Sequence, residues 1–237
     1  MTDVLDPSAI DVPEGASLPY DFFREVHKGL RLAMFRTTAV AGAASYDDAT
    51  ARSEVVERVH GLLGLLHAHH AHEDGFIKPL LDACDRQLSG SVDAGHEQTD
   101  ADMAMIEQLA ADLLATDGED AVVRGFVLYR HLAAFAARYL GHMALEEDEV
   151  MPALRGALSV DELFDVDMQL RGAVPPPTMC AFISVMTPAM NTEERVSMLG
   201  GMQAGAPPEI FELFRNAAEA ALDAADYRSV ATRLGLA

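Results

Sequence analysis

Two stretches of the chain carry the same arrangement of histidine, glutamate and proline. The first reads HHAHEDGFIKPLL at residues 69–81, and the second reads HMALEEDEVMPAL at residues 142–154. Both follow the frame H-x-A-x-E-[DE]-x-x-[IV]-x-P-x-L. Imidazole nitrogens and carboxylate oxygens are ligands for divalent transition metals. A frame that occurs twice therefore predicts a metal site built from two similar halves.

Within each stretch a histidine precedes a glutamate by four residues, as His69 precedes Glu73 and His142 precedes Glu146. On an α-helix, positions four apart differ by only about 40° around the axis. Each histidine therefore points in the same direction as its glutamate. Either pair can bind one ion or help to bridge two.

The sequence around these motifs predicts an all-α fold, an up-down antiparallel four-helix bundle. Between residues 18 and 157, apolar residues recur every three or four positions, and the alternation typical of strands is missing. Segments rich in Gly and Asp are expected to be short turns between antiparallel helices. The predicted turns lie at residues 46–50, 87–93 and 116–120, and the predicted helices near 18–44, 50–86, 91–115 and 119–157. Pro79 and Pro152 fall inside two of these helices and are expected to kink or end them.

Residues 158–237 predict four or five shorter helices packed on the bundle, and residues 1–17 an N-terminal extension. Helix starts are expected at SVDE (residues 159–162), where Ser159 and Glu162 suit a capping box, at NTEE (191–194) and at APPE (206–209). The prolines after Val174 should break the chain. Five of the twelve methionines lie between residues 179 and 202, and this flexible side chain is typical of an irregular packing face.

Charge and composition exclude several classes of protein. The chain has 17 Lys and Arg against 38 Asp and Glu, a formal net charge of −21, which argues against nucleic-acid and anionic-membrane partners. Apolar runs stop well short of the roughly 20 residues of a membrane span. The acidic, proline-containing start is unlike a secretory signal. Cys84 and Cys180 do not suit a disulfide framework, so we expect a cytoplasmic protein; no pattern indicates an oligomeric state.

Every predicted bundle helix carries at least one histidine. His27 on the first helix and His96 on the third complete two similar hairpins with the repeated motifs. Packing the hairpins together would bring four imidazoles and two carboxylates into the bundle interior, a set that suits two adjacent metal ions bridged by carboxylates. The donor set favours iron or manganese, with zinc as a further candidate. His60 and His131 are expected to point elsewhere or lie too far along the axis.

Along residues 18–157 the chain has, in this order, a lone histidine, H-H-x-x-E-[DE]-x-x-[IL]-x-P, a second lone histidine and H-x-x-x-E-E-x-x-[VIL]-x-P. This order resembles that of the haemerythrin-like, or HHE cation-binding, domains. The resemblance implies a non-haem di-iron centre that binds or reacts with dioxygen. Carried over position by position, it implies the ligands His27, His69, Glu73, His96, His142, and either Glu146 or Glu147. Helical spacing favours Glu146, whereas oxygen carriers use the five-residue spacing of Glu147. Related iron-sensing members also use the residue after the second-helix histidine, here His70.

One departure from the family pattern bears on function. Oxygen-carrying haemerythrins have a histidine four residues after the third-helix histidine, where this chain has Asp100. The change favours redox activity towards dioxygen or peroxide, as an oxidase, peroxidase or catalase-like oxidoreductase, over reversible oxygen carriage. The alternative is a sensor of oxygen, nitric oxide or iron without turnover. His67 and His72 are expected to be ordinary helix-face residues, with a position behind the ligands or at the entrance to the site as the alternative. A ferritin-like site would need two Glu-x-x-His pairs, and only Glu57 with His60 provides one.

Overall fold

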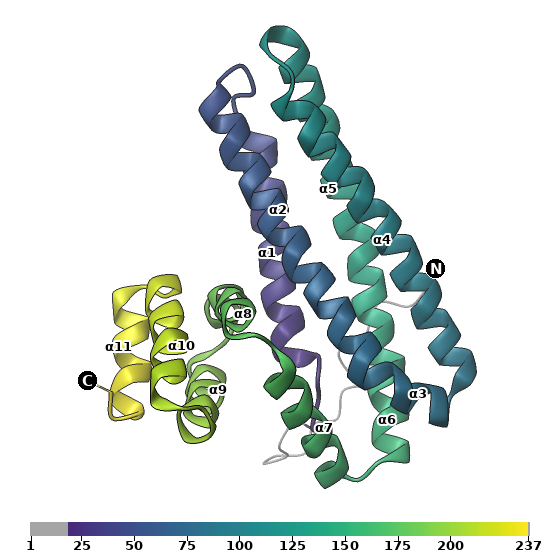
Figure 1. Ribbon diagram of the computed structural model, residues 1–237, viewed down its shortest axis with the longest axis vertical. Helices are drawn as coiled ribbons and strands as arrows, with labels where there is room; N and C mark the ends of the chain where they lie inside the picture. Colours follow the sequence, from purple (N-terminus) through teal and green to yellow (C-terminus); the bar gives the residue numbers. More distant parts are fainter. Residues whose placement is uncertain (1–18, 237) are drawn as a thin grey trace, which may run out of the picture.

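The computed structural model describes residues 19–236, and every regular element in this range is a helix (Figure 1). The predicted all-α bundle is confirmed, while the extension predicted at residues 1–17 lies outside the described range. The bundle consists of α1 (Arg24–Ala43), α2 (Ala49–His72) continued by η2 (Glu73–Ile77) and α3 (Lys78–Cys84), α4 (Arg86–Leu114), and α5 (Gly118–Leu145) continued by η3 (Glu146–Val150) and α6 (Met151–Ala157).

The turn between the second and third long helices is not where the sequence predicts it. α3 ends at Cys84 and α4 begins at Arg86, so the expected turn at residues 87–93 is wrong. Asp85 alone leaves the helical conformation, and its side chain accepts hydrogen bonds from the amides of Gln87 and Leu88. This N-cap satisfies amides that would otherwise lack partners. The Gly and Ser residues that suggested a turn lie inside α4 instead.

Pro79 and Pro152 do not end their helices. Each follows a π-helical turn in which an amide donates to the carbonyl five residues back, Lys78 to Glu73 in η2 and Met151 to Glu146 in η3. Proline has no amide to donate, and in a regular α-helix its ring clashes with the carbonyl four residues back. The wider turn before each proline adapts the helix to it. Both glutamates of the repeated frame are the first residue of such a turn, a feature frequent at functional sites.

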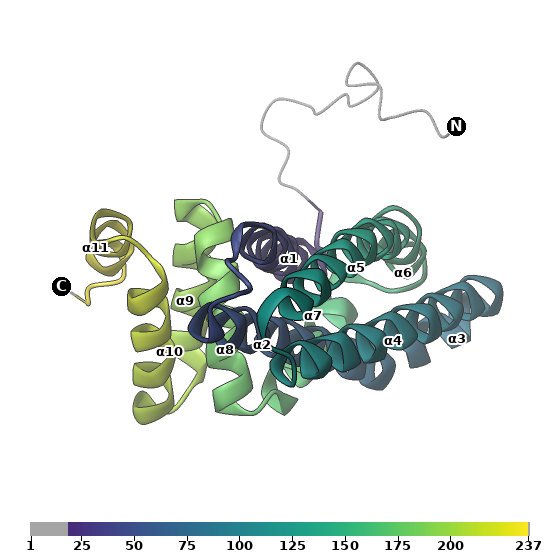
Figure 2. The same ribbon diagram turned by 90° about the horizontal axis from the view of Figure 1, so that it is seen from above.

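The C-terminal part forms five shorter helices, as the sequence predicts. They are α7 (Val160–Ala173), α8 (Pro176–Ala189), α9 (Thr192–Gly205), α10 (Pro208–Ala221) and α11 (Ala224–Arg233). Capping boxes begin α7 at Ser159 and α9 at Asn191. Figure 2 shows α8 to α11 on the α1 and α2 side of the bundle, away from α4. α8 packs against α1 on one side and α10 on the other.

The bundle and the C-terminal helices share one hydrophobic core. Buried residues of α1 and α2, such as Met34 and Val59, belong to the same cluster as Phe182 and Ile183 of α8. Four of the five clustered methionines are buried in it, namely Met179, Met186, Met190 and Met198. The methionine-rich stretch is therefore a packing face. Within residues 19–236, no helix is both long and apolar enough to cross a membrane.

Gly29 allows α8 to lie close to α1, which gives a first prediction. A Cβ atom at Gly29 would lie 2.9 Å from Met186 Cγ and 3.0 Å from its Cα and backbone nitrogen. Because backbone atoms cannot rotate away, Gly29→Ala should cost about 1–3 kcal/mol of overpacking, more than the gain of roughly 1 kcal/mol in helix propensity. Denaturant unfolding should show a lower free energy of unfolding.

Gly64→Ala is the matched control. Gly64 lies inside α2, and a Cβ atom there meets no other described atom within 4 Å. This variant should be as stable as the parent or more so, because alanine has the higher helix propensity. Equal stability of the two variants would contradict the close packing of α8 on α1.

Candidate metal centre

Six side chains from the four long helical segments meet in the bundle interior, and they are the six that the sequence predicts to converge. α1 supplies one histidine, α2 with η2 a histidine and a glutamate, α4 one histidine, and α5 with η3 a histidine and a glutamate. They are His27, His69, Glu73, His96, His142 and Glu146, each with an exposed fraction of 7% or less.

The cluster divides into two overlapping groups that share both glutamates. One group is His27, His69, Glu73 and Glu146, and the other is Glu73, His96, His142 and Glu146. Within each group, one nitrogen or oxygen per residue lies within 4.8 Å of all the others. Each group joins helices from both hairpins. The arrangement matches the two halves that the repeated motif predicts.

Glu73 contacts the two groups with different oxygens. Its Oε1 lies 3.1 Å from His69 Nε2, and its Oε2 lies 3.4 Å from His96 Nε2. A carboxylate that faces two ligand groups in this way can bridge two metal ions, as carboxylates do in other bundle cores.

Glu146 has the same divided orientation. Its Oε2 lies 3.3 Å from His27 Nε2, while its Oε1 lies 2.9 Å from His142 Nε2 and 3.7 Å from His96 Nε2. The first histidine belongs to one group and the other two to the second group. Both glutamates therefore connect the same two halves of the cluster.

Several buried polar atoms of the cluster make no hydrogen bond within residues 19–236. They are both carboxylate oxygens of Glu73, Oε2 of Glu146, Nε2 of His96, and both ring nitrogens of His142. Although His142 Nε2 lies near Glu146 Oε1, that contact is not aligned as a hydrogen bond. Buried polar atoms without partners cost about 1–3 kcal/mol each, and a bound ion is one explanation for them. The donor set of imidazole nitrogens and carboxylate oxygens fits a transition metal.

The second acid of each repeated motif holds a histidine of the other hairpin. Asp74 Oδ1 lies 3.0 Å from His96 Nδ1, and Glu147 Oε1 lies 2.8 Å from His27 Nδ1. Donation of the Nδ1 proton to a carboxylate leaves the Nε2 lone pair free to face the cluster. The Glu-Asp and Glu-Glu pairs therefore place one acid inside the cluster and one behind a histidine.

Glu146 and Glu147 have different positions, which separates the two alternatives left by the sequence. Glu146 is buried among the cluster histidines, whereas Glu147 also accepts two hydrogen bonds of 2.8 Å from the guanidinium of Arg31. Burial would raise the pKa of Glu147, but hydrogen bonds from His27 and Arg31 lower it to about 2. Glu147 is thus a fixed anion behind His27, and Glu146 is the acid that faces the cluster.

His27, His96 and Glu73 hold protons more tightly than usual, whereas burial and the charge of His27 lower the pKa of His69 well below its usual value. Burial alone would lower the pKa values of His27 and His96, but the carboxylates around them, Glu146 first, raise these values to about 9 and about 10. Burial and the charge of Glu146 raise the pKa of Glu73 to about 7. Burial also opposes ionisation of Glu146, but three histidine contacts lower its pKa well below the usual value. A metal ion must displace such protons when it binds.

His70 lies beside the cluster and has other partners. Its Nδ1 is 3.1 Å from Asp100 Oδ1, and its Nε2 is 3.0 Å from the Tyr139 hydroxyl. Burial and the neighbouring His96 lower its pKa to about 4. One nitrogen of His70 also lies within 4.8 Å of those of His96 and His142, so it can join that half. Asp100 faces His70 rather than the six-residue cluster, and its side chain is 56% exposed.

The four remaining histidines lie outside the six-residue cluster. His60, His67 and His131 are exposed, and His131 Nδ1 contacts the carbonyl of Val127. His72 is partly buried and lines a cavity next to the cluster, in agreement with a position at its entrance.

Comparison with known proteins gives one match. The model of the Hemerythrin HHE cation binding domain matches residues 18–154, which include all six cluster residues. No curated protein and no solved structure matches the chain.

Gly95 is part of the site, although no motif or spacing in the sequence indicates this. A Cβ atom at this position would lie 2.5 Å from His142 Nδ1 and 3.0 Å from its Cε1. Gly95→Ala should therefore displace the His142 ring and lower metal affinity, by roughly 10–100-fold, as disturbing the support of a ligand does elsewhere. Metal titration of the purified protein measures the effect.

Gly90→Ala, in the same helix, is the control because an added Cβ meets no described atom within 4 Å. It should leave metal affinity unchanged. Thermal unfolding separates loss of the site from loss of the fold, since both variants gain helix propensity. Unaltered metal affinity in Gly95→Ala would show that His142 does not need its present position.

Proposed function

The chain belongs to the haemerythrin family of HHE cation-binding domains, and we propose that its bundle holds two iron ions and acts as an oxidoreductase on dioxygen or peroxide. The proposal rests on the two carboxylates, Glu73 and Glu146, whose oxygens face different histidine pairs. A single-ion site has no need of two such divided carboxylates. The absence of thiolate from the cluster supports iron or manganese over a sulfur-rich zinc site.

In this assignment, His27 and His69 would hold one ion, and His96 and His142 would hold the other. Glu73 and Glu146 belong to both groups of residues and would be available to both ions. A pair of iron ions would supply electrons for the reduction of dioxygen or peroxide. The protein supplies the orientation of the histidines, through Asp74 and Glu147, and a buried setting that limits water.

The position of Asp100 supports turnover over reversible carriage. Its carboxylate contacts His70 and is half exposed, so in this arrangement it adds no ligand to the half with His96 and His142. That half then has two histidines of its own, and its third neighbour, His70, is engaged by Tyr139. Compared with the oxygen carriers, which have a further histidine at the position of Asp100, this half has one imidazole fewer. The missing imidazole leaves room for an oxygen-containing substrate.

A sensor function is the second candidate, supported by the contact between the C-terminal helices and the first helix. Lys28, which follows His27, contacts Glu194 of α9 at 2.5 Å. A change at His27 that moved α1 would alter this contact. If the sensor reading is correct, protease cleavage of α7 to α11 should differ between the metal-free, reduced and oxidised protein. Identical cleavage patterns would rule it out.

The iron assignment predicts about two irons per chain after anaerobic ferrous loading, with the absorption of a di-ferric centre after exposure to air. His69→Ala and His142→Ala should each lower the iron content and remove this absorption, because each removes a ligand from one half. His131→Ala, at an exposed position, is the control and should keep both. Metal analysis and absorption spectra measure the outcome.

Wild-type protein without stoichiometric iron would contradict the assignment and leave zinc or manganese. Loaded protein that consumes neither dioxygen nor peroxide would exclude the oxidoreductase and favour the sensor.

Glu146→Gln and Glu147→Gln should differ in their effects on metal binding. Glutamine keeps the size of the side chain but removes its charge, so Glu146→Gln should abolish binding of the iron pair. Glu147→Gln should keep the stoichiometry and weaken affinity by roughly 10–100-fold, because it only loosens His27. Iron titration followed by absorption distinguishes them. The reverse order of effects would identify Glu147 as the ligand.

A further inference from the structure

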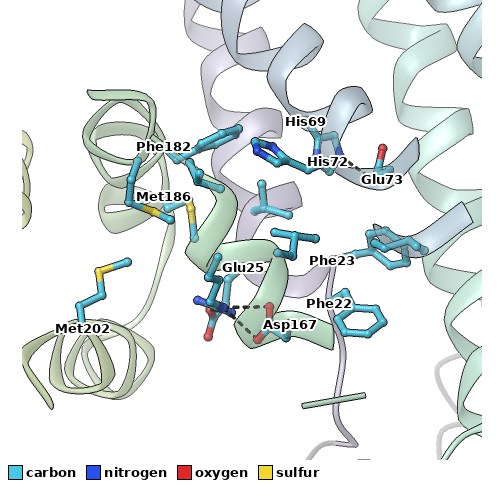
Figure 3. Close-up of a pocket in the computed structure, with 16 residues that line it drawn as sticks. Phe22, Phe23, Glu25, His69, His72, Glu73, Asp167, Phe182, Met186 and Met202 are labelled. Atoms are coloured by element: carbon cyan, nitrogen blue, oxygen red, sulfur yellow. Dashed lines mark hydrogen bonds and ion pairs between the residues drawn. The ribbon is translucent and has the colours of Figure 1, made fainter. Parts of the chain in front are cut away.

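A cavity lies between the bundle and the C-terminal helices (Figure 3). Its volume is about 80 Å³, and it is partly open. α1, α2 and η2 form one wall, and α7, α8 and α9 form the other. The family match ends at residue 154, so the second wall is made by helices outside the matched domain.

One end of the cavity reaches the metal cluster. His69 and Glu73 belong both to the cluster and to the lining of the cavity, and His72 lies next to them. Figure 3 shows these three residues on one side and Phe182 and Met186 of α8 on the other. A molecule in the cavity would therefore lie beside the half of the centre that contains His69.

Apolar side chains make up most of the lining. Phe23 and Val26 come from the bundle side, and Met179, Phe182 and Met186 come from α8. Aromatic rings provide large apolar contact areas, while methionine adapts its shape to the molecule that it contacts. Such walls favour a hydrocarbon surface, since burying it removes that surface from water.

Among the described residues, no unpaired lysine or arginine lies at the polar end of the cavity to bind an anion. Arg171 Nε lies 2.9 Å from both oxygens of Asp167, and its Nη2 lies 3.7 Å from Glu25. The single guanidinium therefore faces two carboxyl groups. The Tyr20 hydroxyl donates a further hydrogen bond to Asp167. A ligand carboxylate placed here would meet acidic groups, and the guanidinium of Arg171 is already paired with them.

The size of the cavity limits the ligand. One water-sized group needs about 10–15 Å³ by this measure, so there is room for roughly five to eight such groups. This is more than a diatomic gas requires. We propose that the cavity binds a small, uncharged, mainly hydrocarbon molecule, of the size of one aromatic ring, beside His69 and Glu73. Its role as a substrate rests on the proposed di-iron function, whereas its binding does not need the metal.

Binding is tested on the full chain without added metal, using toluene and benzoate as probes in ligand-observed NMR titrations. Toluene should bind saturably at one site per chain. Benzoate, of similar shape, should bind roughly tenfold or more weakly, because the acidic groups at the polar end repel it. Absence of saturable toluene binding, or equal binding of the two probes, would overturn the proposal.

Two variants, Val174→Phe and Phe182→Ala, test whether the probes bind in this cavity. Val174 lines it and is 9% exposed, so Val174→Phe should fill it and weaken toluene binding by roughly tenfold or more. Val123→Phe is the matched control, on α5 at a position that is 63% exposed.

Phe182→Ala should enlarge the cavity and admit naphthalene, which the parent chain should exclude. This gain of binding does not depend on whether Val174→Phe folds. Unchanged probe binding in Phe182→Ala and in folded Val174→Phe would exclude this site.

A separate measurement tests whether the bound molecule lies beside the metal centre. Toluene at saturating concentration should shift the absorption spectrum of the iron-loaded protein, and Val174→Phe should abolish this shift. Toluene binding without a spectral change would overturn the location next to the centre. Failure of the chain to bind iron would contradict the proposed function but leave the cavity result intact, so the two failures can be told apart.

Discussion

The structure depends on the burial of two carboxylates close together in the bundle interior. Removing an ionised carboxylate from water costs several kcal/mol, and two like charges side by side add to that cost. Among the described residues, the four cluster histidines are the cationic partners that lie next to Glu73 and Glu146. Each of the four long helices places one cluster histidine there, and the outer acids Asp74 and Glu147 pair with two of these histidines.

The repeat in the sequence also explains why the helices widen where they do. In each motif the glutamate begins a π-helical turn, and the proline is the second residue of the α-helix that follows this turn. The proline therefore marks an altered stretch of helix within the site rather than the end of a helix. A frame of histidine, glutamate, second acid and proline thus encodes a buried histidine–glutamate pair, an acid that orients a histidine of the other hairpin, and the local helix geometry.

Much of the architecture can be predicted from the sequence because it depends on local patterns. Apolar periodicity predicts the long helices, and Ser159 with Glu162 predicts the start of α7. The convergence of the six residues follows from four-residue spacing and hairpin packing, while their ligation stays a prediction. The prediction of a turn at residues 87–93 is wrong because a single residue, Asp85, is enough to end one helix and cap the next. Gly95 and the cavity could not be predicted, since they depend on side chains that meet only after folding.

The two halves of the centre are alike in sequence but have different surroundings. The half with His27 and His69 faces the apolar cavity that α7, α8 and α9 complete. The half with His96 and His142 lies next to His70, whose Nδ1 contacts the half-exposed Asp100 and whose Nε2 contacts Tyr139. Of the four cluster histidines, only His69 lines this cavity, whereas His96 lines a smaller apolar cavity that is formed by bundle residues. The C-terminal helices contribute to this difference, because α7, α8 and α9 line the cavity beside His69. In this way they give a symmetric pair of motifs two distinct sides.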